Sequence, residues 1–174
     1  MVRITGGDLK GRSVLSSDTE GLRPTTSFFR EWIFNVLQNL TDLESVVLLD
    51  LFSGTGAVSF EFISRGAIKS TCVDSSRKMC EMIKKSSAAL GIDNIITVNS
   101  GCYDYLSRLR SSGRADFNTV FIDAPYGDFD QTEKITDQLF SMKDILPEEI
   151  IIIAEISKSN ALNIPDDFTV LRSR

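Results

Sequence analysis

Two hydrophobic patterns alternate along most of this chain. From Ser27 to Leu40 the apolar residues recur at three- and four-residue steps, which is the period of an amphipathic helix with one buried face. Beyond it, short runs that are apolar throughout alternate with longer helical stretches. The predicted strands are 46–52, 70–74, 95–99, 119–123, 150–156 and 168–172, and the predicted helices are 58–65, 76–90, 103–110 and 132–142. This alternation predicts an α/β fold with a mostly parallel, doubly wound sheet and helices on both faces.

The chain is expected to form one domain preceded by an arm. Its 174 residues lie within the range that a single hydrophobic core supports. Residues 1–26 are rich in Gly, Ser, Thr and Arg, so we expect an arm with at most a short hairpin before a domain over residues 27–174. No apolar run approaches the roughly 20 residues of a membrane helix, and the first residues lack the apolar stretch of a secretory signal. We therefore expect a cytoplasmic protein with no membrane partner.

The residue types narrow the available chemistry. The chain has no histidine, which removes the commonest general base and the usual partner of a Ser or Cys nucleophile. Cys72, Cys80 and Cys102 are widely spaced and form no CxxC pair, so we expect reduced core residues rather than a disulfide framework or a zinc site. No metal is predicted, and catalysis is left to carboxylates, aromatic rings and backbone groups.

The charge is distributed unevenly. A net charge of -5 weighs against a nucleic-acid partner, because phosphate contacts usually come from a basic surface. Over the first thirty residues, however, basic side chains outnumber the acidic Asp8, Asp18 and Glu20. The basic residues of this segment are Arg3, Lys10, Arg12, Arg23 and Arg30. The sequence thus predicts an acidic body that carries a locally basic arm.

A glycine-rich turn follows the strand predicted at residues 46–52. The segment Asp50-Leu51-Phe52-Ser53-Gly54-Thr55-Gly56-Ala57 leads into a helix at the carboxyl edge of the sheet, where doubly wound folds bind ligands. Gly54 and Gly56 have no Cβ, which permits a tight turn and a close approach to a ligand. Asp74 ends the next strand, 20 residues after Gly54, where a carboxylate can accept hydrogen bonds from a ribose diol. These features indicate an adenosine-type cofactor, and a purely structural turn is the alternative.

The neighbours of the glycines favour S-adenosylmethionine over NAD. Asp50 suits a cofactor with a cationic amino or sulfonium group, whereas a carboxylate beside a diphosphate would cost Coulomb energy. Ser59 stands where the dinucleotide fingerprint has a third glycine or alanine. An NAD-linked oxidoreductase stays open as an alternative, although no histidine or acid suited to hydride transfer accompanies the turn.

A second motif ends the strand predicted at residues 119–123. Asp123-Ala124-Pro125-Tyr126 lies at the same carboxyl edge as the glycine turn. Pro125 fixes its φ angle, so the Asp123 carboxylate and the Ala124 carbonyl can converge as two acceptors on one amino group. Tyr126 can stack on a base drawn out of its helix. We predict these four residues as the catalytic group, and a simple strand-ending β-turn is the alternative.

With these motifs in place, the chain resembles the RsmD-type bacterial methyltransferases, which modify a guanine N2 in 16S ribosomal RNA. The resemblance covers nearly the whole chain and includes the N-terminal stretches Ile4-Thr5-Gly6-Gly7, Gly11-Arg12 and Gly21-Leu22-Arg23-Pro24-Thr25-Thr26, followed by Arg30-Glu31 and Phe34-Asn35. It implies a seven-stranded, Rossmann-like class I methyltransferase fold, S-adenosylmethionine as the methyl donor, and 16S ribosomal RNA in small-subunit particles as the substrate. It also implies that the basic arm contacts RNA, with Arg23 near the cofactor or the target.

The predicted cofactor-binding residues lie on three successive strand ends. They are Asp50, Phe52, Gly54, Gly56, Asp74, Ser75, Gly101 and Cys102. Three departures from the family pattern affect them or their surroundings. Ala124 replaces a usual proline, and Gly101 lacks the side chain with which the family binds adenine, which leaves backbone groups near Cys102. The sequence also stops at Arg174, where the family continues into a last strand that pairs with residues 168–172, so an edge strand is expected to be missing.

The leading hypothesis is methyl transfer from S-adenosylmethionine to the N2 of a guanine in 16S ribosomal RNA. An adenine-N6 methyltransferase that acts on DNA or RNA is a close alternative, since the same pair of acceptors serves either amino group. A catalytically silent protein that binds RNA or assists assembly is an alternative of another class, given Ala124 and the short C-terminus.

Overall fold

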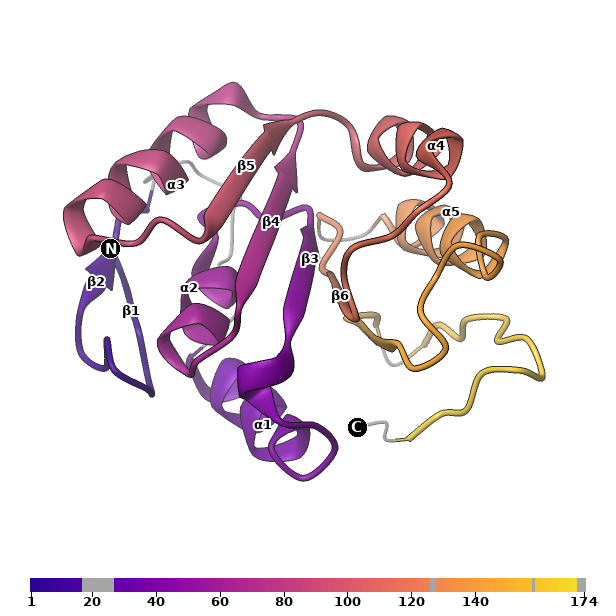
Figure 1. Cartoon of the computed structure of the whole chain (residues 1–174), viewed down its shortest axis with the longest axis horizontal. Coiled ribbons are helices and arrows are strands. Elements are labelled where there is room, and N and C mark those ends of the chain that lie inside the picture. Colours follow the sequence, from indigo (N-terminus) through magenta and orange to yellow (C-terminus); the bar gives the residue numbers. More distant parts are fainter. Residues whose placement is uncertain (17–26, 126–127, 158, 172–174) are drawn as a thin grey trace.

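A five-stranded parallel sheet forms the centre of the molecule (Figure 1). The computed structural model describes residues 1–16, 27–125, 128–157 and 159–171. The strands are β3 (Val47–Leu51), β4 (Lys69–Asp74), β5 (Ile95–Asn99), β6 (Thr119–Ile122) and β7 (Ile151–Ala154). Their order is β5-β4-β3-β6-β7, and every neighbouring pair is parallel. The prediction of a parallel α/β sheet is confirmed. The central strand is β3, and the chain adds β4 and β5 on one side of it and β6 and β7 on the other.

Helices cover both faces of this sheet, as the apolar strands predicted. The helices are α1 (Ser27–Leu37), α2 (Ala57–Ser64), α3 (Arg77–Leu90), α4 (Cys102–Ser112) and α5 (Phe129–Phe140), with a 3₁₀ turn η1 (Leu43–Ser45) before β3. On one face, Leu48 of β3 packs in a cluster with residues of α1 and α2. On the other face, Leu49 and Leu51 pack in a cluster with Leu106 of α4 and Ile135 of α5. Alternate residues of one strand therefore enter two separate cores, which is why the strand is apolar throughout.

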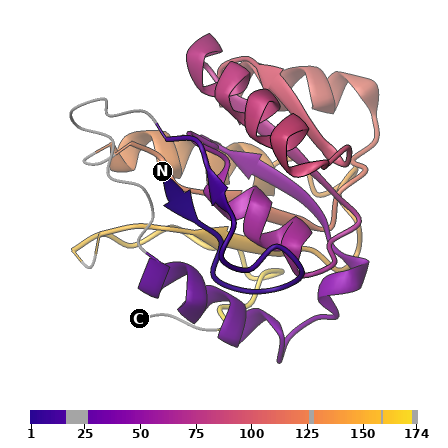
Figure 2. The same cartoon turned by 90° about the vertical axis from the view of Figure 1, so that its left-hand side faces the viewer.

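The N-terminal segment forms a short hairpin that packs against α2 (Figure 2). Its antiparallel strands are β1 (Val2–Arg3) and β2 (Ser13–Val14). Ile4 and Val14 are buried in one cluster with Phe60 of α2 and Ile83 of α3. Residues 1–16 thus share a core with the domain, while the predicted boundary at residue 26 lies outside the described residues.

The Gly6-Gly7 pair has a structural role in docking this hairpin. Gly7 has a φ of 73°, and a Cβ built on it would lie 1.7 Å from the carbonyl oxygen of Ser64 at the end of α2. The neighbouring Asp8 N–H donates to that same carbonyl at 2.7 Å. Only glycine fits so close to another backbone at this φ. The glycine pair noted in the sequence is therefore explained by the contact between the hairpin and α2.

One predicted strand is absent from the described part of the chain. Residues 168–171, expected as the last strand, form no strand in the structure. Instead, the Phe168 N–H donates to the carbonyl of Pro165 in a turn, and the Phe168 ring packs on Phe140 with the ring centroids 4.6 Å apart. A strand needs a partner that pairs with its backbone, and in the described residues β7 is the last element of the sheet on this side. The described sheet accordingly has five of the seven strands that the resemblance implied.

Two smaller findings concern the expected environment. All three cysteines are buried free thiols, as predicted. Among the described residues, no helix combines the length and the apolar character that crossing a membrane requires.

Candidate functional site

The glycine turn after β3 has a backbone that most residues avoid. Its φ angles are positive at Phe52 (60°), Gly54 (51°) and Gly56 (72°). A Cβ on Gly56 would lie 3.0 Å from Ile83 of α3, so glycine there also allows α2 and α3 to pack closely. A Cβ on Gly54 would meet nothing nearer than 3.9 Å. A positive φ at a side-chain residue such as Phe52 is uncommon and marks strained backbone, which concentrates at functional sites.

Asp74 organises the edge of the sheet next to this turn. Its Oδ2 accepts a hydrogen bond from the Gly54 N–H at 2.8 Å, and its Oδ1 accepts one from the Ser76 N–H at 2.7 Å. The turn after β3 and the start of α3 are thus fixed to the same carboxylate. Each carboxylate oxygen has a second lone pair. Asp74 therefore shapes the turn and keeps acceptor capacity for a ligand.

Asn99, which the sequence analysis did not single out, fastens β5 to the same corner. Its side-chain amide donates to the carbonyls of Asp74 at 3.0 Å and Ser75 at 2.9 Å. The Ser100 N–H also donates to the Asp74 carbonyl, at 3.0 Å. An amide side chain at the end of an apolar strand was the available sequence signal. With Asn99 in place, the ends of β3, β4 and β5 form one hydrogen-bonded unit.

Asp50 lies behind the turn rather than on its surface. Only 2% of the residue is exposed, and its Oδ2 accepts a hydrogen bond from the Ser59 hydroxyl of α2 at 2.5 Å. Ser70 and Cys72 of β4 also donate to the Ser59 oxygen, at 2.7 and 3.0 Å. Burial raises the pKa of Asp50 to about 7, against the lowering effect of the Ser59 hydrogen bond and with smaller contributions from the carboxylates Asp123 and Asp74. A cation that approaches Asp50 from the turn would favour its ionised form.

The second motif reaches the same edge from β6. Asp123 directly follows β6, and β3 pairs with both β4 and β6. Asp123, Asp74 and Asp50 lie close enough together for the first two to perturb the pKa of the third. Ala124 is half-buried and Pro125 is exposed, and the Pro125 carbonyl accepts the N–H of Asp128, the cap of α5. Tyr126 lies outside the described residues.

Glu155 is a carboxylate at this edge that the sequence analysis missed. It directly follows β7, and its N–H donates to the Ile122 carbonyl of β6 at 2.9 Å. Burial, with a smaller contribution from the nearby charge of Asp123, raises the pKa of Glu155 to about 7. The strand predicted at residues 150–156 included Glu155, whereas the observed β7 ends at Ala154. Glu155 therefore lies just past the end of its strand, as Asp123 does after β6.

The remaining predicted cofactor residues differ in exposure. Ser75 is exposed after β4, and Gly101 is half-buried as the cap before α4. The Cys102 side chain is 4% exposed and belongs to the core cluster under α4 and α5, where burial raises the pKa of its thiol to about 12. Cys102 can therefore serve a ligand through its backbone and not through its sulfur.

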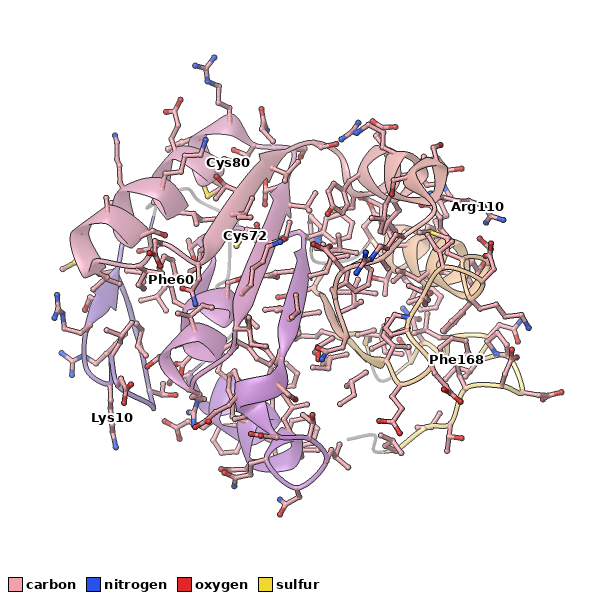
Figure 3. All side chains as sticks on the ribbon, in the orientation of Figure 1. Lys10, Phe60, Cys72, Cys80, Arg110 and Phe168 are labelled. Carbon is pink, nitrogen blue, oxygen red and sulfur yellow. The ribbon has the colours of Figure 1, made fainter. Side chains whose placement is uncertain are left out.

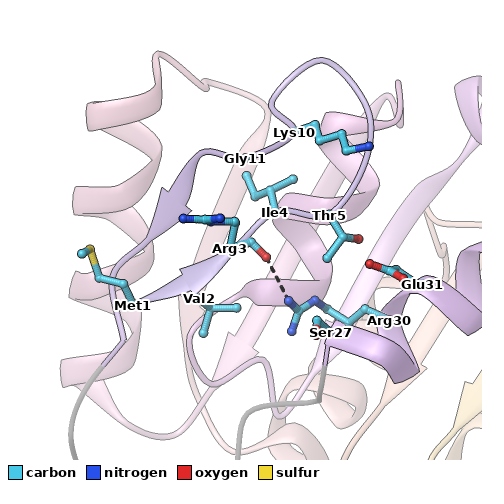
Figure 4. A pocket seen from close by; sticks show the side chains of 10 residues that line it. All are labelled: Met1, Val2, Arg3, Ile4, Thr5, Lys10, Gly11, Ser27, Arg30 and Glu31. Atoms are coloured by element: carbon cyan, nitrogen blue, oxygen red, sulfur yellow. Dashed lines mark hydrogen bonds between the residues drawn. The ribbon is translucent and has the colours of Figure 1, made fainter.

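The structure separates the predicted RNA-contacting residues into two groups. Arg3, Lys10 and Arg12 of the hairpin are exposed, and Arg23 lies outside the described residues. Arg30 is only 2% exposed, so the expectation that it contacts RNA is wrong for this structure. Its guanidinium donates to the Arg3 carbonyl at 3.0 Å (Figure 4). It also pairs with the Glu61 carboxylate at 3.4 Å. Arg30 is held inside by a buried carboxylate, because a buried charge needs a partner.

The hairpin does not reach the carboxyl edge in the described residues. Its loop docks on Ser64, at the opposite end of α2 from the glycine turn, and Figure 3 shows Lys10 far from Cys80, which lies in the first turn of α3. A hollow of about 720 Å³ lies between the hairpin and the start of α1, and Arg3 and Lys10 are among its lining residues. The exposed cations therefore form a surface separate from the carboxylate edge.

The edge has features that suit a polar ligand with an adenosine group. Ser53 in the turn is 8% exposed, and its buried hydroxyl has no hydrogen-bond partner among the described residues. The space over Gly54 is open, and Asp74 retains acceptor capacity beside it. In the described part of the chain, no three metal-binding side chains gather into a group that could hold a metal ion. A ligand that offers donors to Ser53 and Asp74 fits this edge.

Comparison with known proteins gives consistent matches. Residues 2–174 match the model of the family described as conserved hypothetical protein 95. The chain is 30% identical to ribosomal RNA small subunit methyltransferase D of Escherichia coli strain K12, over 99% of this chain and 84% of that protein. The protein of the same name from Buchnera aphidicola subsp. Baizongia pistaciae is 31% identical over 72% of this chain and 61% of its own length. Among solved structures, the putative methyltransferase yhhF from Escherichia coli superposes with a TM-score of 0.85 at 26% identity, over 99% of this chain and 90% of that one.

Proposed function

Because this chain belongs to the conserved hypothetical protein 95 family, which includes the RsmD-type enzymes, and has their Rossmann-like class I fold, we propose that it is an rRNA methyltransferase. We propose S-adenosylmethionine as the donor and the N2 amino group of a guanine in 16S ribosomal RNA as the acceptor. One observation carries the proposal: adjacent strands bring the glycine turn with Asp74 and the Asp123-Ala124-Pro125 segment to one edge of the sheet.

The glycine turn and Asp74 would hold the donor. S-adenosylmethionine, when bound, supplies a methyl group on a cationic sulfonium. The Asp74 carboxylate has acceptor capacity for the ribose hydroxyls, and the unpartnered Ser53 hydroxyl and open Gly54 backbone suit the polar end of the molecule. A cationic ligand at the turn would favour the ionised form of the buried Asp50 carboxylate, which would then attract the cation.

The segment after β6 would hold the acceptor amino group. Asp123 and the Ala124 carbonyl can each accept one N–H of an exocyclic amine. Accepting both hydrogens increases the electron density on the nitrogen, whose lone pair is otherwise delocalised into the base, and directs it toward the donor methyl group. Rate enhancement then comes mainly from positioning and fixed electrostatics. Pro125 fixes the backbone of this turn at its own φ.

The RNA would be bound by the exposed basic residues of the N-terminal segment. Arg3, Lys10 and Arg12 lie on the hairpin surface, and we propose with them Arg23 from outside the described residues. Phosphate contacts of this kind give affinity without base specificity. The names of the relatives at 30% and 31% identity support ribosomal RNA of the small subunit as the substrate class.

The direct test is transfer of labelled methyl from S-adenosylmethionine to small ribosomal subunits that lack the modification, followed by nucleoside analysis. Label in N2-methylguanosine is the expected result. Label in N6-methyladenosine would replace guanine by adenine as the acceptor. Cofactor and RNA binding without any transfer would instead identify a silent RNA-binding protein.

Replacing Asp74 by alanine is expected to weaken binding of S-adenosylhomocysteine by at least about tenfold, because the ribose loses a charged acceptor. Calorimetry measures this dissociation constant. The variant also removes the partner of the Gly54 N–H, so the ribose contact must be isolated from the turn. A ligand analogue without the ribose hydroxyls isolates it: the wild type should bind the analogue weakly, and the variant should bind both ligands alike. If removing the ribose hydroxyls weakens binding equally in the wild type and in the variant, the contact between Asp74 and the ribose is refuted.

Replacing Gly101 by asparagine is expected to tighten binding of S-adenosylhomocysteine by about three- to tenfold, the worth of one hydrogen bond to adenine. Gly101 has an ordinary φ of -62°, and an added Cβ would meet nothing nearer than the Asp104 carboxylate at 3.5 Å. The side chain therefore fits without strain. Gly113→Asn at the other end of α4 is the control and should leave the dissociation constant unchanged. No gain from Gly101→Asn would show that adenine is not bound beside this residue.

A further inference from the structure

Asp123 and Glu155 occupy equivalent positions on neighbouring strands. β6 and β7 pair in parallel with Ile122 opposite Ala154, and Asp123 and Glu155 are the next residues of each strand. The hydrogen bond from the Glu155 N–H to the Ile122 carbonyl, at 2.9 Å, extends the ladder to this point. Register partners in a parallel sheet lie side by side. The two carboxyl groups are therefore neighbours at the edge where the amino group of the substrate would lie.

The Glu155 side chain has an unused acceptor at this place. Its Oε2 is buried and has no hydrogen-bond partner among the described residues. No Lys or Arg side chain of the described part forms a salt bridge with it. Burying such an oxygen without a donor is unfavourable, and native structures seldom do so without a functional reason. Glu155 Oε2 therefore has the capacity to accept one more donor, which a ligand bound beside Asp123 would supply.

The two candidate bases differ at the atom that would meet this acceptor. In guanine, the N1 atom next to the amino group carries a hydrogen and is a donor, whereas the corresponding N1 of adenine is an acceptor. An ionised carboxylate only accepts hydrogen bonds. If Asp123 holds the amino group, its neighbour Glu155 is the carboxylate available to N1 of the same base edge. Burial and the nearby charge of Asp123 raise the pKa of Glu155, and an N1–H donor would favour its ionised form.

We propose that Glu155 is a specificity-determining residue, which selects guanine by accepting its N1–H while Asp123 accepts a hydrogen of the N2 amino group. The inference rests on the proposed function and deepens it by naming the residue that distinguishes guanine from adenine. A site built to pair with a donor rejects an analogue that lacks it, because its own buried group is then left unpaired.

The probe is 2-aminopurine, which keeps the 2-amino group of guanine and has no hydrogen on N1. Small-subunit particles are reconstituted with RNA that carries either guanine or 2-aminopurine at the methylated nucleotide. We expect the wild type to prefer guanine by about tenfold or more in kcat/KM and in particle binding with S-adenosylhomocysteine present. In Glu155→Gln the amide can accept or donate, so the preference should fall to about twofold or less. Glu149→Gln, an exposed glutamate before β7, is the matched control and should keep the wild-type preference.

The two readouts distinguish this inference from the proposed function. A wild type that transfers no methyl group would refute the proposed function. The ratio of the binding constants for particles with guanine and with 2-aminopurine would still test the role of Glu155. The inference is overturned if Glu155→Gln keeps the wild-type ratio, or loses transfer to both bases in parallel as a purely structural residue would. It is also overturned if the wild type does not distinguish the two bases.

Discussion

Replacing Asp123 by alanine is expected to reduce methyl transfer by about 100-fold or more, and to leave the dissociation constant of S-adenosylmethionine nearly unchanged. Asp123 follows β6, whereas the donor would be bound by the turn after β3 and by Asp74. The substitution removes a fixed acceptor from the amino nitrogen, so its cost should fall on the transfer step. Single-turnover assays measure that step, and calorimetry measures the binding of the donor.

Two comparisons make the Asp123 result interpretable. Asp123→Asn keeps one acceptor oxygen but replaces the other by a donor, so it should also transfer slowly although its shape is nearly unchanged. Asp130→Ala, an exposed aspartate in the first turn of α5, should retain wild-type transfer. Equal losses of cofactor binding and transfer in Asp123→Ala would mean that Asp123 holds the donor site together and does not act on the acceptor.

The elements that bury continuous apolar runs were predictable from the sequence. The run that became β5 was predicted with its observed bounds, Ile95–Asn99, because both of its ends are marked by polar residues. Residues 168–171 have a similar composition yet form no strand. An apolar composition shows that a segment is able to pair as a strand. Whether it does so depends on a free neighbouring strand, which is set by the arrangement of the whole sheet. The match of residues 2–174 to the family confirms the resemblance, although the net charge of -5 by itself weighed against a nucleic-acid partner.

The site was predictable where it depends on the local backbone and was missed where it depends on neighbours in space. The positive φ angles of Gly54 and Gly56 could be inferred from the glycines themselves. Glu155 acquires its significance only from the pairing of β7 with β6, which the sequence does not state. Whether these residues act as proposed stays a prediction for the experiments above.

Arg30 shows how a charge count can mislead. It was assigned to the basic arm because it lies within the first thirty residues. Yet Arg30, Ile33, Phe34 and Leu37 form the buried face of α1 at steps of three and four. The helical period thus placed Arg30 on the inner face, and a buried counter-charge was the necessary consequence. The sequence held that signal, but the partner, Glu61 in α2, is 31 residues away.

Replacing Glu61 by alanine is expected to lower the free energy of unfolding by about 3–5 kcal/mol, because it leaves a buried charge without its partner. Glu61 is 0% exposed; its Oε1 accepts the Thr5 N–H at 2.7 Å and pairs with Arg30, and its Oε2 lies 3.6 Å from Arg65 Nε. One carboxylate therefore joins the hairpin, α1 and α2. Urea unfolding followed by circular dichroism measures the loss, which is a large share of the roughly 5–15 kcal/mol of a typical domain.

A matched control separates the buried charge from the loss of a glutamate as such. Glu81 forms an i,i+4 pair with Arg77 at 3.0 Å on the exposed face of α3, and Glu81→Ala should cost no more than about 1 kcal/mol. The double variant Arg30→Met, Glu61→Met removes both buried charges and should recover most of the loss, since Arg65 is partly exposed and can reach water. If Glu61→Ala unfolds at nearly the urea concentration of Glu81→Ala, the ion pair does not hold the hairpin to α1 and α2, and the apolar contacts of Ile4 and Val14 must do so alone.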